Sequence, residues 1–144
     1  MTTITMRYTK GAFLVTKAVM PHMIEQGWGR VINISSRAYL GNPTQANYSA
    51  AKAGLIGMAK ALAMEEGRYG ITVNCVAPGR IATPRLDHLY PGGPTPESLD
   101  AIALRRWGTP REFGDVVCFL ASERARYVTG QTVVVDGGLQ QALF

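Results

Sequence analysis

Two long segments of the chain carry apolar side chains at helical spacing. Residues 11–26, GAFLVTKAVMPHMIEQ, repeat apolar positions at intervals near 3.6 and predict a helix that Gly27 ends. Residues 48–68 predict a longer helix, whose many alanines and glycines would let another helix approach closely. The apolar side of this second helix comprises Ala51, Leu55, Ala59, Leu62 and Ala63.

Three shorter segments are runs of β-branched and other apolar residues. They are RVINIS at 30–35, ITVNCVAPG at 71–79 and TGQTVVVDGG at 129–138. Their length and composition predict buried strands. Strands that alternate with helices favour an α/β fold, here with a short parallel sheet of about three strands and flanking helices.

The pattern between residues 80 and 122 is less regular. LYPGGPTPES at 89–98 is rich in turn-forming residues and predicts a mobile loop. ESLDAIALRRW at 97–107 predicts a short amphipathic helix. Thr109 and Pro110 are typical of a helix start, and the following residues, REFGDVVCFLAS, continue that helix to 122.

Composition narrows the class of protein. The chain has 144 residues, 47% of them hydrophobic and 17% charged, which predicts one globular domain, 1–144. Residues 1–9 have little pattern and are set aside from the fold as a leader. The sequence has no run of eighteen apolar residues, so we expect no membrane span. The net charge of +5 is scattered without a basic stripe, which argues against nucleic-acid binding.

The two cysteines bear on compartment and metal binding. Cys75 and Cys118 lie in the apolar runs VNCVAP and DVVCFLA, and no other cysteine or histidine stands at metal-ligand spacing from them. We therefore expect no metal site, and we expect both cysteines to be reduced core residues of a cytoplasmic protein.

The stretch NYSAAKAG at 47–54 carries the candidate chemistry. Tyr48 and Lys52 stand four residues apart, about one helical turn, so their side chains project from the same face. An ammonium group beside a phenol stabilises the phenolate and makes the phenol a better proton donor. Taken alone, the same spacing is also that of an ordinary solvated pair on a helix surface.

The ends of the strands add further polar groups. Ligands of parallel sheets bind beyond the carboxyl ends of the strands. Ser35 and Ser36 stand at the end of the first strand, and Tyr48 and Lys52 begin the helix that follows its loop. We therefore expect two serines, a tyrosine and a lysine around one point at the edge of the sheet.

Four motifs, NISS, NYSAAKAG, GITVNCVAPGRIATP and TGQTVVVDGG, follow one another in this order within residues 10–139. In order and spacing they resemble the C-terminal half of a short-chain dehydrogenase/reductase, with the 3-oxoacyl-[acyl-carrier-protein] reductases as the most similar group. The resemblance implies a truncated Rossmann-like fold of three layers. It also implies NAD(P)H-dependent reduction of a small carbonyl or 3-oxoacyl substrate.

The resemblance implies a role for individual residues. Tyr48 would protonate the carbonyl oxygen, Lys52 would support Tyr48 and bind the nicotinamide ribose, and Ser36 would hydrogen-bond the substrate oxygen. The loop from Ser36 to Tyr48 is one residue shorter than usual in the family, so Ser35 is the alternative serine. The segment 84–107 would be the substrate loop. The residues that would line the nicotinamide are Pro78, Gly79, Ile81 and Thr83.

The nucleotide-binding half of the family has no counterpart in this sequence. The TGxxxGxG turn does not occur, and the position of the family's catalytic asparagine aligns with Tyr8. Because the pyrophosphate of NADP or NAD normally binds at that turn, we expect this chain to bind the dinucleotide poorly or not at all.

Two other functions stay open at this point. Ser49 and Lys52 form an SxxK pattern, and Ser36 could be activated by Tyr48, so a nucleotide-independent hydrolase that acts on a small ester is one alternative. The other is an inactive fragment that oligomerises. Loss of neighbouring strands would leave an open sheet edge and uncovered helix faces, so we expect a homodimer or homotetramer through helices 11–26 and 48–68.

Overall fold

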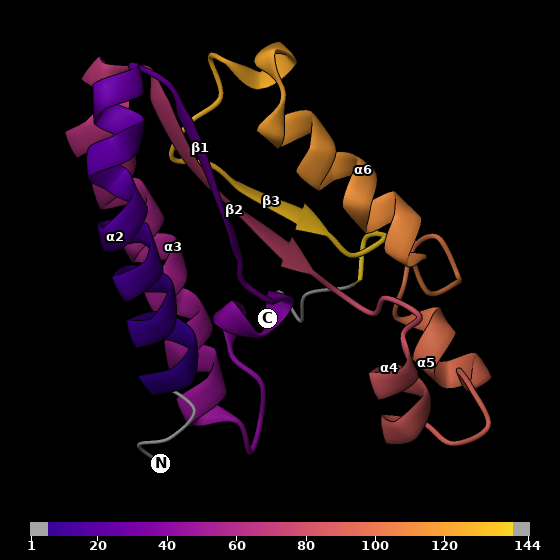
Figure 1. Ribbon diagram of the computed structural model, residues 1–144. Helices are drawn as coiled ribbons and strands as arrows, with labels where there is room; N and C mark the ends of the chain where they lie inside the picture. The colour runs from indigo at the N-terminus through magenta and orange to yellow at the C-terminus, as the bar shows by residue number, and fades with distance from the viewer. Residues whose placement is uncertain (1–5, 140–144) are drawn as a thin grey trace.

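A three-stranded parallel sheet lies between two layers of helices in this computed structural model, which describes residues 6–139 (Figure 1). The strands are β1 (Gly29–Ile34), β2 (Ile71–Pro78) and β3 (Thr132–Val135), in the order β1-β2-β3. Gly29 pairs with Ile71, and Cys75 pairs with Thr132. The predicted α/β fold with a short parallel sheet is therefore confirmed.

The helices α2 (Gly11–Gln26) and α3 (Ala46–Glu66) cover one face of the sheet, and α6 (Pro110–Ala121) covers the other (Figure 1). Met20 of α2 and Ala59 of α3 pack with Val73 of β2 in one core cluster. Leu120 of α6 packs with Val76 of β2 in a second cluster. The central strand is buried along almost its whole length because it has helices on both faces and strands on both edges.

Local sequence signals explain where the helices begin and end. Gly27 adopts a left-handed conformation, with φ of 63°, and its N–H closes the end of α2 on the Ile24 carbonyl oxygen. Thr109 and Glu112 form a reciprocal capping box at the start of α6, where the sequence predicted a helix start.

The segment before α2 belongs to the packed structure. The described part of the stretch 1–9, residues 6–9, lies in a short π-helix, η1 (Met6–Lys10), which runs directly into α2. The Thr9 hydroxyl group donates a hydrogen bond of 3.1 Å to the Ala51 carbonyl oxygen of α3. Residues 1–5 of the predicted leader lie outside the described residues.

The prediction of one helix over 97–107 is wrong, because α5 covers only Pro96–Asp100. The next residues turn back instead: Arg105 has a positive φ of 55°, and Ile102 is buried and bridges to Leu139. Burial of Ile102 against the chain after β3 is a tertiary contact that local periodicity does not report.

Further differences concern shorter elements and one cysteine. The sequence did not predict α4 (Pro84–Leu89) or the 3-10 helix η2 (Arg37–Leu40). Two other short 3-10 helices, η3 (Gly67–Tyr69) and η4 (Glu123–Ala125), follow α3 and α6. Cys75 is buried as expected, but Cys118 is exposed on α6, so its predicted place in the core is wrong. No described helix is both long and apolar enough to span a lipid bilayer.

Candidate active site

The side chain of Lys52 is buried near the carboxyl end of β1. Its Nζ atom donates a hydrogen bond of 2.7 Å to the Ile34 carbonyl oxygen, at the last residue of that strand. The residue is only 6% exposed. Burial lowers the pKa of Lys52, and the positive charge of Arg85 lowers it further. The amine is thus held at the sheet edge where the sequence predicted a site.

Tyr48 lies one helical turn before Lys52 on α3, on the same side of the helix. The Lys52 Nζ atom is 5.7 Å from the centroid of the Tyr48 ring, so the predicted proximity of phenol and amine is present. Tyr48 is half-buried, and within residues 6–139 its hydroxyl group has no hydrogen-bond partner. A group with this exposure is accessible to a ligand.

The two candidate serines have different environments. Ser35 is 2% exposed, and its hydroxyl group donates a hydrogen bond of 2.8 Å to the Lys52 carbonyl oxygen. Ser36 is half-buried, and its Oγ atom accepts a hydrogen bond of 3.2 Å from the Ala38 N–H at the start of η2. The Ser36 hydroxyl hydrogen is not used in that contact, so Ser36 retains a donor and Ser35 does not.

Ser49 and Lys52 do not form the activated pair that the SxxK pattern suggested. The Ser49 Oγ atom accepts a hydrogen bond of 3.2 Å from the Asn42 N–H, and the Lys52 amine donates to Ile34. The two side chains have separate partners, and neither contact makes Ser49 a nucleophile.

The residues expected to line the nicotinamide form one stretch at the carboxyl end of β2. Pro78 ends that strand, and the Gly79 N–H donates a hydrogen bond of 2.9 Å to the Val135 carbonyl oxygen. Ile81 bridges to Gly108, and Thr83 is the residue before α4. The segment after β2 therefore lies beside the end of β3 at Gly79 and beside Gly108 at Ile81.

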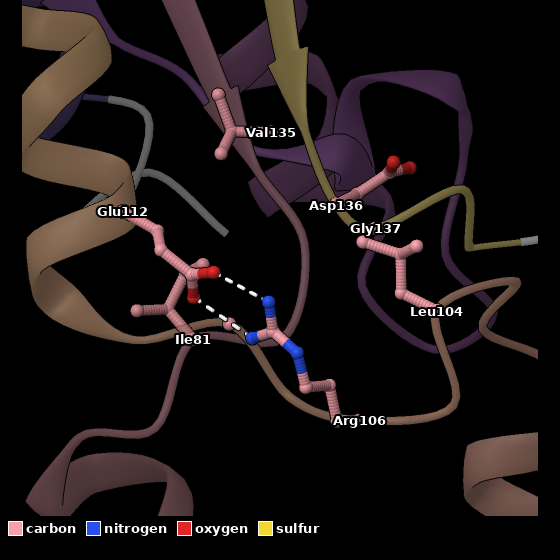
Figure 2. Close-up of a pocket in the computed structure, with 8 residues that line it drawn as sticks. Ile81, Leu104, Arg106, Glu112, Val135, Asp136 and Gly137 are labelled. Carbon is pink, nitrogen blue, oxygen red and sulfur yellow. Dashed lines mark hydrogen bonds and ion pairs between the residues drawn. The ribbon is translucent and has the colours of Figure 1, made fainter.

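A small pocket of about 100 Å³ opens between these segments and the start of α6 (Figure 2). Arg106 and Glu112 line the pocket and form a bidentate ion pair. This contact lowers the pKa of Glu112 to about 2. Of the predicted site residues, Ile81 lines the pocket, whereas Ser36, Tyr48 and Lys52 do not. We therefore define the candidate active site by the contacts of Tyr48 and Lys52 rather than by this pocket. The full lining is Ile81, Leu104, Arg106, Gly108, Glu112, Val135, Asp136 and Gly137.

Three contacts at or near the site were not predicted from the sequence. The Tyr8 ring centroid lies 4.4 Å from the Lys52 Nζ atom, and the Tyr8 and Tyr48 rings meet edge to face with centroids 5.8 Å apart. Arg37 Nε lies 3.8 Å from Asp136 Oδ2 and so links the segment after β1 to the end of β3. None of these contacts is marked by a local motif, because the partners are far apart along the chain.

The sequence of the chain matches a known protein family over almost all of its length. The profile of the family described as enoyl-(acyl carrier protein) reductase matches residues 2–140. The chain belongs to the short-chain dehydrogenase/reductase family. The resemblance stated from the four motifs is therefore confirmed.

Curated relatives of this short-chain dehydrogenase/reductase include proteins named for different substrates. A 3-oxoacyl-[acyl-carrier-protein] reductase of Thermotoga maritima is 48% identical over 131 residues, which cover 90% of this chain and 53% of that protein. A (2S)-[(R)-hydroxy(phenyl)methyl]succinyl-CoA dehydrogenase subunit of Thauera aromatica is 48% identical over 134 residues, with coverages of 90% and 52%. The chain spans about half the length of these relatives.

Solved structures agree with the sequence relatives. A gluconate 5-dehydrogenase from Burkholderia cenocepacia, in complex with NADP and tartrate, superposes with a TM-score of 0.84 at 36% identity. The superposition covers 93% of this chain and 54% of the dehydrogenase chain. A 3-oxoacyl-[acyl-carrier protein] reductase from Brucella melitensis with bound NAD gives a TM-score of 0.81 at 39% identity, with coverages of 94% and 50%. The Rossmann-like fold that the resemblance implied is thus confirmed.

Proposed function

We propose that this chain supplies the proton-donating half of an NAD(P)H-dependent carbonyl reductase whose substrate is a 3-oxoacyl thioester. The observation that carries the proposal is the Lys52 amine, fixed 2.7 Å from the Ile34 carbonyl oxygen and one turn from Tyr48. The relatives named 3-oxoacyl-[acyl-carrier-protein] reductase, at 48% identity, support this substrate class.

Tyr48 is the proposed acid of the reaction. Its hydroxyl group donates a proton to the carbonyl oxygen of the substrate while the carbonyl carbon accepts a hydride, so the product is an alcohol. The nearby Lys52 ammonium stabilises the phenolate that remains. Ser36 donates a hydrogen bond to the same substrate oxygen and orients it toward Tyr48.

We propose that the described residues contact only the nicotinamide end of the cofactor. The nicotinamide dinucleotide would supply the hydride when bound, and Lys52, Ile81 and Thr83 are the residues that would hold its nicotinamide and ribose. The pyrophosphate has no comparable place: the TGxxxGxG turn is absent from the sequence, and the Glu112 carboxylate already occupies the start of α6. We therefore propose weak binding of NADP or NAD by this chain alone.

The substrate segment is proposed to be 84–107, which contains α4 and α5. Three of its large apolar side chains are exposed: Leu89, Tyr90 and Leu104, at 58%, 37% and 63%. An acyl chain that packs on these side chains would bury apolar surface on both partners.

The test compares the chain alone with a fusion. Oxidation of NADPH by an acetoacetyl thioester would be measured for residues 1–144, and for the same residues fused behind the nucleotide-binding half of the Thermotoga maritima reductase. We expect no measurable rate for the chain alone and turnover by the fusion. Tyr48→Phe in the fusion should lower kcat by about 10²-fold or more, because the general acid is lost.

Tyr69→Phe is the matched control, since it removes a hydroxyl group from a half-buried tyrosine of η3, which precedes β2 at the end of that strand opposite to Pro78 and Gly79. Equal rates for the Tyr48→Phe fusion and the parent fusion would refute the proposal. Release of p-nitrophenol from a short-chain ester, assayed in parallel, would identify the hydrolase instead. The separate partners of Ser49 and Lys52 lead us to expect none.

A further inference from the structure

The amine of Lys52 contacts two aromatic rings in addition to its hydrogen-bond acceptor. It donates to the Ile34 carbonyl oxygen at 2.7 Å, and it lies over the rings of Tyr8 and Tyr48 at 4.4 and 5.7 Å from their centroids. The nearer ring is that of Tyr8. An ammonium within about 6 Å of a ring centroid is attracted to the electron-rich face, and the attraction is stronger where water is excluded.

Tyr8 is held in this place by contacts of its own. It lies on η1, which is continuous with α2, and the neighbouring Thr9 hydroxyl group is bonded to the Ala51 carbonyl oxygen of α3. Its ring also meets the Tyr48 ring edge to face, with an interplanar angle of 82°. The position of the ring is therefore fixed by α2 and α3 as well as by the amine.

We propose that Tyr8 is a positioning residue for Lys52: its ring caps the ammonium group and holds it against the Ile34 carbonyl oxygen. A lysine side chain has four flexible carbon–carbon bonds, so holding it in one conformation costs rotamer entropy that a single hydrogen bond must offset. The cap removes the space into which the amine would otherwise turn toward solvent. Lys52 is only 6% exposed, whereas the Tyr8 ring that covers the amine is itself 36% exposed.

This inference goes beyond the proposed reductase activity, because it concerns the conformation of Lys52 in the unliganded chain. It has a consequence for any chemistry at this site. Tyr48 and Lys52 lie on one helix, but the direction of the amine is set by a residue that precedes α2. A change at Tyr8 would alter the direction of the amine and leave α3 in place.

The experiment is proton NMR of the full unliganded chain with 13C-labelled lysine and tyrosine. We expect a nuclear Overhauser contact between the Tyr8 ring protons and the Lys52 ε-methylene protons. We also expect these ε-methylene protons to be shifted upfield by the ring and to give two separate resonances, because a fixed methylene is not averaged. The exposed Lys60 on the same helix should give a single averaged resonance without an upfield shift, and serves as the internal reference.

Three variants complete the test. Tyr8→Phe keeps the ring and should keep the Lys52 signature, whereas Tyr8→Leu should move the Lys52 resonances to those of Lys60. Tyr39→Leu, a tyrosine change outside the cluster, should leave the Lys52 signature unchanged. Absence of the Tyr8–Lys52 contact in the unmodified chain would overturn the proposal, and so would an unaltered Lys52 signature in Tyr8→Leu. If Tyr8→Leu does not fold, the spectra of the unmodified chain and of Tyr8→Phe still support or refute the cap.

Discussion

The Ser35 hydroxyl group donates a hydrogen bond of 2.8 Å to the backbone carbonyl oxygen of Lys52. This contact joins the end of β1 to the second turn of α3 and leaves Ser35 buried. The neighbouring Ser36 keeps a hydroxyl hydrogen that is not donated to any of residues 6–139. The two adjacent serines therefore have different tasks, one in holding the site together and one, as proposed, in binding the substrate oxygen.

Alanine substitutions separate these two serines. Ser35→Ala should lower the free energy of unfolding by about 1–2 kcal/mol, because it removes a buried hydrogen bond. Ser36→Ala should cost only about 0.5 kcal/mol, from the loss of the cap on η2, but should lower kcat of the reductase fusion by about 10²-fold. Urea unfolding and NADPH oxidation measure the two effects. A larger loss of kcat in Ser35→Ala would reverse the assignment.

Gly79→Ala should destabilise the junction of β2 and β3. A Cβ atom at Gly79 would lie 2.5 Å from the Asp136 Cβ atom and 2.8 Å from its Cα atom, so the two segments would have to separate. We expect a loss of about 1–3 kcal/mol in the free energy of unfolding. Gly57→Ala is the matched control, because a Cβ atom there meets nothing within 4 Å on the exposed side of α3.

The control substitution should act in the opposite direction. Alanine is a better helix former than glycine, so Gly57→Ala should stabilise the chain by about 0.5–1 kcal/mol. Thermal or urea unfolding of both variants gives the comparison. Similar effects of the two substitutions would mean that Gly79 and Asp136 are not in close contact in solution.

Cys75 should make the stability of the chain depend on pH in the alkaline range. Burial raises the pKa of the Cys75 thiol from 9.0 to about 11. Between these values the folded chain keeps a proton that the unfolded chain releases, so stability is full below pH 9 and falls as the pH rises toward 11. The loss between about pH 8 and about pH 10 should be about 1 kcal/mol.

The Cys75→Ala variant isolates this effect. Urea unfolding at about pH 8, 9 and 10 should show that the free energy of unfolding of the unmodified chain declines with pH, whereas that of the variant does not show this decline. Lys52, whose pKa is lowered by burial, contributes a slope of the opposite sign in both proteins, but the charge of the Cys75 thiolate, which raises the Lys52 pKa, acts only in the unmodified chain. Parallel pH profiles for the parent and the variant would show that the thiol does not carry the effect.

The outer surface of α2 leads us to expect a dimer or tetramer. Phe13, Leu14, Val15 and Val19 are 39–65% exposed on one helix, which is unusual for so many large apolar side chains. Light scattering at micromolar concentration should give at least a dimer, and Val15→Glu should shift it toward monomer. Lys17→Glu, an exposed change on the same helix that removes no apolar contact, is the control. A monomeric parent chain would contradict this expectation.

Local patterns predicted the regular elements well where the local signal and the tertiary contacts agree. β2 is a continuous apolar run because helices cover both of its faces, and the start of α6 follows from Thr109 and Glu112 alone. The failures lie in 80–107 and at Cys118. Local periodicity predicted one helix over 97–107, but Ile102 is buried and the helix ends before it. The apolar run around Cys118 predicted burial, but this residue lies on the exposed side of α6.

The sequence by itself determined the α/β order of elements, the four family motifs and the placement of Tyr48 and Lys52 on one helical face, because each of these depends on residues close together in the chain. Only the tertiary structure decided the partners of the site residues. Ile34 receives the Lys52 amine, Ser35 is bonded to α3, and Tyr8 covers the ammonium group. These contacts join segments that are distant in sequence, and their formation depends on how α2 and α3 pack on the sheet.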